Sequence, residues 1–312
     1  MIELSIYIPT FRRLNQLSDL LIQLDKSFNI LLKTNVIALE QFEIVISAND
    51  SNERSNIIDV CNSNLNIIKP KVVSPFLNIG SNNNVRAAAS QTSGEYIWCL
   101  CDDDLINEGT LKFIFELVKN REFSLLYLEP FIVDPKNLNF EYNSNSTNPR
   151  FVNEVLEFIP QDSDKAEIFV IDDNWLSNNA VSLLRASSLV YCRATTHRYW
   201  TSEYSSQTRI APICIAFDAL SGGIGLYTKK PMYVYVDANK DAWAKEWLFT
   251  YYFELLPTIV KFLKTRKLLR IEKYTKINKS DYIGLIISMI CTWKKAFMPN
   301  NVILFLKYVL HF

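Results

Sequence analysis

Apolar and polar positions follow two different rhythms over the first 130 residues, and each rhythm predicts one kind of element. Short runs rich in β-branched and aromatic residues that end in turn residues predict strands, whereas leucine, isoleucine or alanine at spacings of three and four predict helices. The predicted strands span residues 3–8, 42–47, 71–75, 95–101 and 124–133, and the predicted helices span residues 15–34, 55–64, 85–94 and 106–120. We expect Pro9 and Thr10 to stop the first strand and Gly94 to cap the third helix.

This alternation with short connections is typical of an α/β protein, so we expect a mostly parallel sheet with helices on both faces. In such sheets ligands bind beyond the carboxyl ends of the strands. Polar clusters follow three of the predicted strands at that edge, at residues 9–12, 49–51 and 102–104. The sequence therefore predicts a ligand site there.

The second half of the chain has a weaker pattern. Residues 135–165 are rich in Asn, Ser, Pro and Asp and predict a loop or insertion. Later strands are expected within residues 182–193 and 231–236, with a helix ending near residues 221–223. From Trp243 onward the pattern is helical and aromatic, so we expect a main domain over residues 1–238 and a helical C-terminal region over residues 239–312.

Composition excludes several classes of protein. Hydrophobic residues make up 49% of the chain and charged residues 21%, which is typical of a globular protein. The 33 basic and 33 acidic residues give no net charge, so no nucleic-acid partner is expected. Six cysteines without a CxxC pair and only two histidines make a zinc site improbable. No apolar run is long enough for a transmembrane helix or shaped like a signal peptide, so we expect a cytoplasmic protein.

The triplet Asp102, Asp103 and Asp104 directly follows a predicted buried strand. Adjacent carboxylates repel one another unless a cation or hydrogen-bond donors neutralise them. Oxygen ligands without histidine favour Mg²⁺ or Mn²⁺. The alternative interpretation is a solvated acidic turn that caps the helix starting near Asn107.

Three segments carry a resemblance to a known family. The runs SIYIPTFRR, EIVISANDS and NIGSNNNVRAAASQTSGEYIWCLCDDDLI resemble, in order and spacing, the family 2 glycosyltransferases of the GT-A fold over about residues 3–115. The closest likeness is to bacterial members that build O-antigen or capsule polysaccharides, including abequosyltransferase-like enzymes. The resemblance implies a donor half (residues 1–115), an acceptor half (residues 116–238), a nucleoside-diphosphate sugar donor, and Mn²⁺ or Mg²⁺.

The resemblance also implies roles for residues of the donor half. Those expected to bind the nucleotide sugar are Pro9, Thr10, Phe11, Arg12, Asn49, Asp50, Asn78, Gly80, Arg86, Asp102 and Asp103. Where the family presents an aspartate to the base, this chain has Ala48, with Asn49 and Asp50 beside it. Arg86 suits a phosphate contact or a surface charge.

In the acidic triplet, Cys101 aligns with the first aspartate of the family's Asp-x-Asp pair, and Asp103 aligns with the second. The resemblance makes Asp103 the expected metal ligand, and the flanking Asp102 and Asp104 are expected to hold the metal with it. Because a thiolate is a poor partner for a hard cation, we expect Cys101 to be a small buried residue and not a ligand.

The general base near the acceptor hydroxyl is the part of the site for which the sequence gives the weakest signal. The family places a carboxylate, often Glu-Asp, at the start of a late helix, and no Glu-Asp follows the predicted strand ending near residue 193. Glu203 is the best candidate for the base, and Asp218 is expected to be structural.

The sequence therefore predicts a metal-dependent, inverting sugar transfer to a hydroxyl of a bacterial surface glycan or its lipid-linked precursor. A catalytically inactive GT-A domain that acts as a binding scaffold is the alternative, favoured by Ala48, Cys101 and the missing Glu-Asp. A nucleotidyltransferase is disfavoured because the loop after the first strand has no glycine. The aromatic, lysine-bearing residues 283–312 fit either a peripheral contact with the inner face of the plasma membrane or a helix pair packed on the core.

Overall fold

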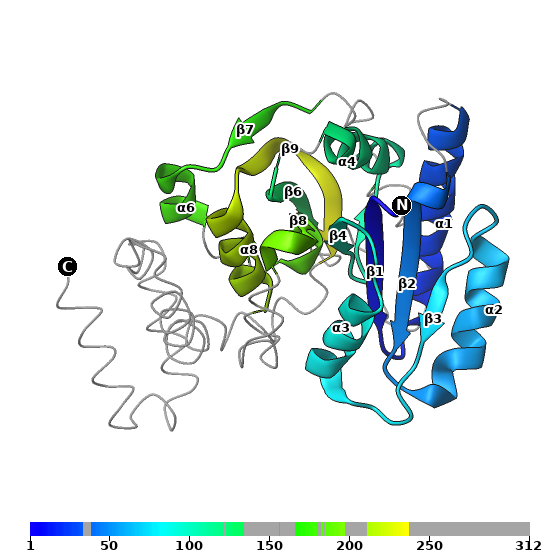
Figure 1. The fold of residues 1–312 in the computed structure, drawn as a ribbon. Coiled ribbons are helices and arrows are strands. Elements are labelled where there is room, and N and C mark those ends of the chain that lie inside the picture. The colour runs from blue at the N-terminus through cyan, green and yellow to red at the C-terminus, as the bar shows by residue number, and fades with distance from the viewer. Residues whose placement is uncertain are drawn as a thin grey trace, which may run out of the picture. The chain divides into compact units, whose positions relative to one another are not determined.

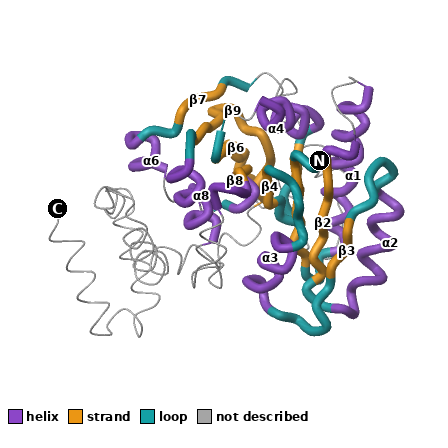
Figure 2. Tube along the Cα trace, viewed as in Figure 1, coloured by secondary structure: helices purple, strands orange, loops and turns teal. Residues whose placement is uncertain are grey.

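The computed structural model of the chain describes residues 1–33, 39–120, 123–133, 156, 166–179, 182–183, 185–196 and 211–236. Its strands are β1 (Leu4–Thr10), β2 (Phe42–Ala48), β3 (Lys71–Val73), β4 (Tyr96–Cys99), β5 (Leu105–Ile106), β6 (Leu125–Val133), β7 (Ile168–Val170), β8 (Leu189–Cys192) and β9 (Gly225–Val236). Its α-helices are α1 (Leu14–Lys33), α2 (Arg54–Asn64), α3 (Gly80–Ser90), α4 (Glu108–Asn120), α6 (Asp173–Asn179) and α8 (Ala211–Gly222). Figures 1 and 2 show these elements along the chain.

The strands form one sheet in the order β3-β2-β1-β4-β8-β6-β9-β5, with β7 paired to β9. Strands β1 to β4 pair in parallel, β8 runs against both β4 and β6, and β9 pairs in parallel with β6. Strands β5 and β7 run against β9. Since β1 to β4, β6 and β9 therefore share one direction, the expected mostly parallel α/β sheet is confirmed.

The core lies between the donor half of the sheet and α1, α2 and α4. Alternate residues of β1, such as Leu4, Ile6 and Ile8, are fully buried and belong to one apolar cluster with the buried leucines of α1. Helix α3 packs against β1 and β2, and Figure 1 shows it on the side of these strands opposite to α1 and α2. Helices thus cover both faces of this part of the sheet.

Two predicted boundaries are wrong. Strand β1 continues through Pro9 and Thr10, which pair with Ser47 and Ala48 of β2. Proline is tolerated there because β4 pairs with β1 only as far as Tyr7, so one side of β1 is already free of the ladder. Helix α3 begins at Gly80 and ends at Ser90, so Gly94 does not cap it.

Gly94 instead lies against strand β1. A Cβ atom on Gly94 would approach the Ser5 hydroxyl oxygen to 2.4 Å and the Ser5 amide nitrogen to 2.7 Å. The Gly94 amide donates a hydrogen bond of 2.7 Å to the Ser5 hydroxyl. This glycine is required by close approach of the backbone before β4, and not by a helix end.

Strand β7 and helix α6 were not expected from the sequence, because their polar and exposed positions give no clear period. The chain divides into one compact unit of Met1–Asp172 and Val181–Asp237 and a second of Asp173–Ala180 and Ala238–Phe312, of which the structure describes only α6. The predicted loop at residues 135–165 lies almost wholly outside the described residues too, so the division at residue 238 stays a prediction. Among the helices that the structure describes, none has the length and apolarity needed to cross a membrane.

Asp19 of α1 provides a test of this packing. Burial raises its pKa from 3.8 to about 6, so its neutral form is favoured in the folded state. The associated stability is fully present below pH 3.8 and is lost as the pH rises through about 6. We expect Asp19→Asn to stabilise the fold by about 1 kcal/mol near neutral pH, after allowing for solvent screening, and to have no effect in acid. Thermal melts of both proteins across this pH range would measure the difference, and a stabilisation independent of pH would contradict it.

Candidate functional site

The carboxyl ends of β1 and β2 are locked together by a buried side chain. The Asn84 amide nitrogen donates to the main-chain oxygens of Thr10 at 3.3 Å and Ser47 at 3.2 Å. The Ser47 hydroxyl donates back to the Asn84 side-chain oxygen at 2.5 Å. The main-chain N–H of Asn49 donates to the Thr10 carbonyl at 3.1 Å. The edge expected to bind a ligand is therefore rigid where β1 and β2 end.

The loop that leads into α3 is shaped by Asn49 and Asn78. The Asn49 side-chain oxygen accepts a hydrogen bond of 3.1 Å from the Ile79 amide, and that of Asn78 accepts one of 2.8 Å from the Gly80 amide. Gly80 has a φ of 78°, a left-handed conformation that favours glycine. The Asp50 carboxylate caps the short 3₁₀ helix Ser51–Glu53 by accepting from the Asn52 amide at 3.0 Å. These three polar side chains hold turns of the edge, and their contact with a nucleotide stays a prediction.

Phe11 and Arg12 extend from the end of β1. Arg12 is exposed and has a φ of 56°, which is uncommon for a residue with a side chain. Its guanidinium carbon lies 4.9 Å from the centroid of the Phe11 ring, and its amide donates to the Glu53 carboxylate at 3.1 Å. An aromatic ring and a cation are thus presented together at the edge.

Residues Asp102, Asp103 and Asp104, hereafter the acidic turn, connect β4 to β5. Asp102 and Asp104 are only 3% and 1% exposed, whereas the side chain of Asp103 is 35% exposed. The acidic turn does not cap α4, because the Asn107 side chain accepts from the Gly109 amide at 2.8 Å in the first turn of that helix. The alternative of a solvated helix cap is therefore wrong.

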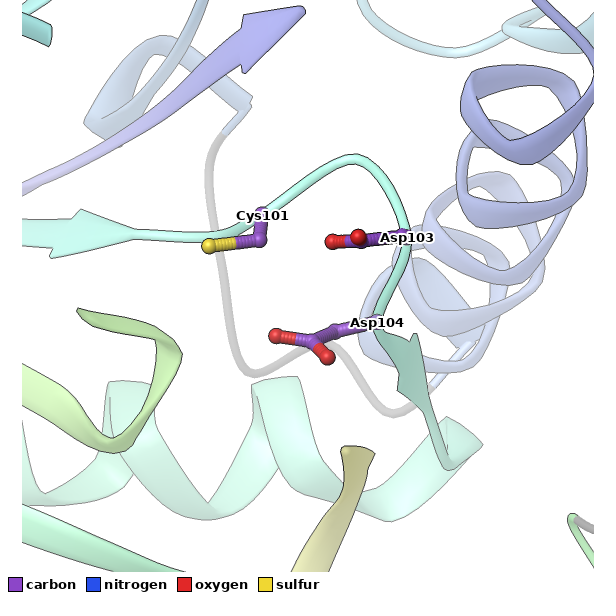
Figure 3. Close-up of side chains that lie close together, drawn as sticks. All are labelled: Cys101, Asp103 and Asp104. Atoms are coloured by element: carbon purple, nitrogen blue, oxygen red, sulfur yellow. The ribbon is translucent and has the colours of Figure 1, made fainter. Parts of the chain in front are cut away.

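The structure brings three possible ligand atoms together at this turn. The sulfur of Cys101 and carboxylate oxygens of Asp103 and Asp104 all lie within 4.8 Å of one another. Figure 3 shows the Asp103 and Asp104 side chains extending to the same side of the turn, with Cys101 in the connection that follows β4. Asp102, expected as a metal ligand from the sequence, lies outside this group and is paired with Arg13.

Arg13 is the functional residue that sequence reasoning missed. One of its guanidinium nitrogens, Nη1, lies 2.9 Å from Oδ1 of Asp102 and 2.6 Å from Oδ2 of Asp103. It therefore holds both carboxylates from the start of α1. The sequence signal was the second arginine of the FRR run, where only Arg12 was nominated.

The electrostatics of the acidic turn fit a divalent cation. Burial and the neighbouring Asp103 raise the pKa of Asp102 to about 7, against the opposing effects of Arg13 and Thr10. Burial, then Cys101 and Asp103, raise the pKa of Asp104 well above its ordinary value. Among the described residues, Oδ2 of Asp102 and Oδ1 of Asp104 have no hydrogen-bond partner. Buried carboxylate oxygens without donors fit Mn²⁺ or Mg²⁺ well.

Cys101 is not suited to be a ligand. A hydrogen bond to Cys99, together with burial, raises the pKa of the Cys101 thiol well above its ordinary value. A protonated thiol binds metal poorly, and a thiolate prefers softer metals. Asp103 and Asp104 are thus the residues that can hold a hard cation.

Comparison of the structure with solved structures identifies the fold. TarS residues 1–349 from S. aureus superposes with a TM-score of 0.59 at 15% identity, covering 98% of this chain and 79% of that one. The mannosyltransferase PcManGT from Pyrobaculum calidifontis, solved with GDP-Man and Mn²⁺, superposes with a TM-score of 0.52 at 10% identity, covering 99% and 80%. The chain has the GT-A fold. No protein-family model and no curated protein matches the sequence.

A complex of TarS with UDP-GlcNAc is also similar to this chain, with a TM-score of 0.50 at 14% identity over 92% of this chain and 80% of that one. In this GT-A fold, the acidic turn and residues 9–12 lie at the carboxyl ends of adjacent parallel strands, β4 and β1. Arg86 is half-buried on α3 and forms no ion pair within the described residues, so its role stays a prediction. Asp218 is buried in α8, and Glu203 lies outside the described residues.

Replacing Arg13 tests how this GT-A domain neutralises the negative charge of its acidic turn. We expect Arg13→Gln to lower stability by about 1–3 kcal/mol with a chelator present, because charge-assisted hydrogen bonds to Asp102 and Asp103 are lost. Mn²⁺ should then raise the melting temperature of the variant more than that of the wild type, because the negative charges of Asp102 and Asp103 are no longer neutralised by Arg13 in the variant. Thermal melts with EDTA and with Mn²⁺ measure both effects, with Arg13→Lys as an intermediate control. Equal melting temperatures in EDTA would contradict the expectation.

Proposed function

We propose that the protein transfers a sugar from a nucleoside-diphosphate sugar to a hydroxyl group, with Mn²⁺ or Mg²⁺ at the acidic turn. The observation that carries this proposal is the turn itself. Buried carboxylate oxygens that have no donor among the described residues lie beside the half-exposed Asp103, at the carboxyl edge of a GT-A sheet. A cation at such an edge would neutralise the leaving diphosphate in glycosyl transfer, whereas buried carboxylates without a ligand would destabilise the fold.

Each part of the edge has a task in this proposal. Asp103 and Asp104 hold the cation, which neutralises the charge that develops on the leaving diphosphate. The end of β1, at Pro9, Thr10, Phe11 and Arg12, lies against the base and ribose. Asn49 and Asp50 face the base, and Asn78 and Gly80 shape the loop beside it. Arg86 reaches a phosphate.

Further details of the reaction rest on the family resemblance. Direct displacement by the acceptor hydroxyl inverts the anomeric centre, and Glu203 is the base nominated by sequence. The acceptor is a bacterial surface glycan, such as O-antigen or capsule, or its lipid-linked precursor. A cytoplasmic enzyme with peripheral contact to the inner face of the plasma membrane meets such an acceptor. The TarS structures with UDP and UDP-GlcNAc and the mannosyltransferase with GDP-Man and Mn²⁺ support the donor class.

An inactive GT-A scaffold is the second candidate. Residue 48, where the family presents an aspartate to the base, is an alanine and has no carboxylate. Ala48 is also fully buried. Cys101 likewise replaces a carboxylate in the metal motif. A scaffold has no need of Mn²⁺-dependent donor binding, and this property separates the two candidates.

The test is a thermal-shift panel of UDP, GDP, CDP and TDP and their sugars, each with and without Mn²⁺. A ligand at 100 times its Kd stabilises a fold by about 2.7 kcal/mol, which is readily measured. We expect one base to give a shift that depends on Mn²⁺. If every nucleotide leaves the melting temperature unchanged, the scaffold is the better description.

A further inference from the structure

A second carboxylate lies at the carboxyl edge, two strands away from the acidic turn. Val190 of β8 pairs with Trp98 of β4 on one side and with Leu126 of β6 on the other. Both strands run toward the carboxyl edge, where Cys101 lies three residues beyond Trp98, past the end of β4, and Glu129 lies three residues beyond Leu126, within β6. Two strand spacings correspond to about 10 Å. Glu129 is therefore near the acidic turn, on the acceptor side of it.

Side-chain hydroxyls near the start of β8 have contacts toward both. The Ser187 hydroxyl oxygen accepts a hydrogen bond of 2.9 Å from the Cys101 amide. The Ser188 and Tyr233 hydroxyls are hydrogen-bonded at 2.7 Å, and Ser188 also hydrogen-bonds Tyr127, whose pKa is raised by burial and then by Glu129. A continuous polar strip thus runs from the acidic turn to Glu129 through the start of β8.

The Glu129 side chain is half-buried and makes no hydrogen bond within the described residues, although its backbone amide donates one of 3.0 Å to the Thr228 hydroxyl oxygen. Burial raises its pKa and the nearby Arg185 opposes this, without forming an ion pair with it in the described part of the chain. Arg185 and Tyr127 are the charged and titratable groups that face it.

Glu43 shows what a structural carboxylate of the same sheet looks like. It accepts hydrogen bonds from the Ser5 hydroxyl at 2.5 Å, from the Ser93 amide and hydroxyl, and from the Gly94 amide at 3.2 Å. These bonds lower its pKa despite burial. Glu43 thus accepts four hydrogen bonds at one carboxylate oxygen, while the Glu129 carboxylate accepts none from the described residues.

We propose that Glu129 is the general base of the transfer reaction, an inference that rests on the proposed function. The acceptor hydroxyl gives its proton to a Glu129 carboxylate oxygen as its oxygen bonds to the anomeric carbon. The bond from that carbon to the diphosphate oxygen breaks, and its electron pair leaves with the nucleoside diphosphate. Arg185 is a positioning residue whose charge opposes the effect of burial on the pKa of Glu129. This assigns to a residue of β6 the role that was expected for Glu203.

The experiment compares Glu129→Gln, Glu203→Gln and the control Glu40→Gln, an exposed glutamate that precedes β2. Three quantities are measured: the melting temperature without ligand, the Mn²⁺-dependent shift caused by UDP-GlcNAc or GDP-mannose, and release of nucleoside diphosphate from the donor that binds. For Glu129→Gln we expect an unchanged or higher melting temperature, a retained donor shift, and release slowed roughly 10²–10⁴-fold with loss of its dependence on an ionised carboxylate in the pH profile.

The outcomes separate the two proposals. A lower melting temperature for Glu129→Gln without ligand would mean that the side chain is structural, and release at the wild-type rate would mean that it is not the base. Loss of release in Glu203→Gln alone would return the role to Glu203. Failure of the proposed function has a different signature, since the wild type itself would then show no Mn²⁺-dependent donor shift.

Discussion

Asp103→Ala is expected to abolish the stabilisation that Mn²⁺ and a nucleotide sugar together give to the wild type. Asp103 is the half-exposed member of the acidic turn, and the ligand group formed with Asp104 and Cys101 loses one of its two carboxylates. Mn²⁺ binding would then depend on Asp104 alone, because Cys101 carries a protonated thiol. Transfer activity should fall by at least 10²-fold, the order expected when charge on a leaving group is no longer neutralised.

The same substitution should leave the unliganded protein folded. Asp103 is the least buried of the three carboxylates, and Arg13 keeps its contact with Asp102. Melting temperatures with EDTA, with Mn²⁺ and with Mn²⁺ plus donor separate the effect on binding from the effect on stability. Asp59→Ala, in an exposed turn of α2, is the matched control. An undiminished Mn²⁺-dependent shift in Asp103→Ala would remove the acidic turn from the donor site.

Trp98→Ala is expected to cost about 3–5 kcal/mol of folding free energy, a large part of the stability of a typical domain. Trp98 is fully buried in β4, and its indole nitrogen donates a hydrogen bond of 2.9 Å to the Ser187 carbonyl. The substitution opens a cavity in the core and leaves this carbonyl without its donor. Because the Ser187 hydroxyl also accepts from Cys101, the acidic turn should lose order as well.

Urea denaturation followed by circular dichroism measures this loss of stability. Trp98→Phe retains an apolar ring but not the donor, so its cost should lie well below that of alanine. Mn²⁺-dependent stabilisation should weaken in Trp98→Ala even where the protein remains folded. A loss of folding free energy below about 1 kcal/mol for Trp98→Ala would contradict the expectation that Trp98 contributes strongly to the stability of the core.

The donor half was predictable because its signals are local. Strands β1, β2 and β4 each combine a continuous apolar run with an abrupt polar end, and α1 has leucines at helical spacing. The position of the acidic turn followed from the same pattern. Helix α3 was harder, since its first turn is an Asn-rich segment that reads as a loop until Gly80 and Asn78 form their turn.

The remaining features depend on contacts between distant residues. No local pattern indicates that Asp102 is buried while Asp103 is not, or that Arg13 reaches across from α1 to hold both. The placement of Glu129 at the same edge of the sheet as Cys101 depends on how β8 pairs with both β4 and β6. Such register is set by tertiary packing, which a single sequence does not display.

The pairing of β4 has a consequence for how the chain is made. During synthesis, β4 can join β1 as soon as both have emerged, but its other neighbour, β8, lies about 90 residues further along. Until then, β4 is an exposed apolar edge, the kind of surface from which nascent chains aggregate. Ribosome-bound intermediates that end between β4 and β8 are therefore the species most in need of a chaperone, and the strand that carries the acidic turn is the one at risk.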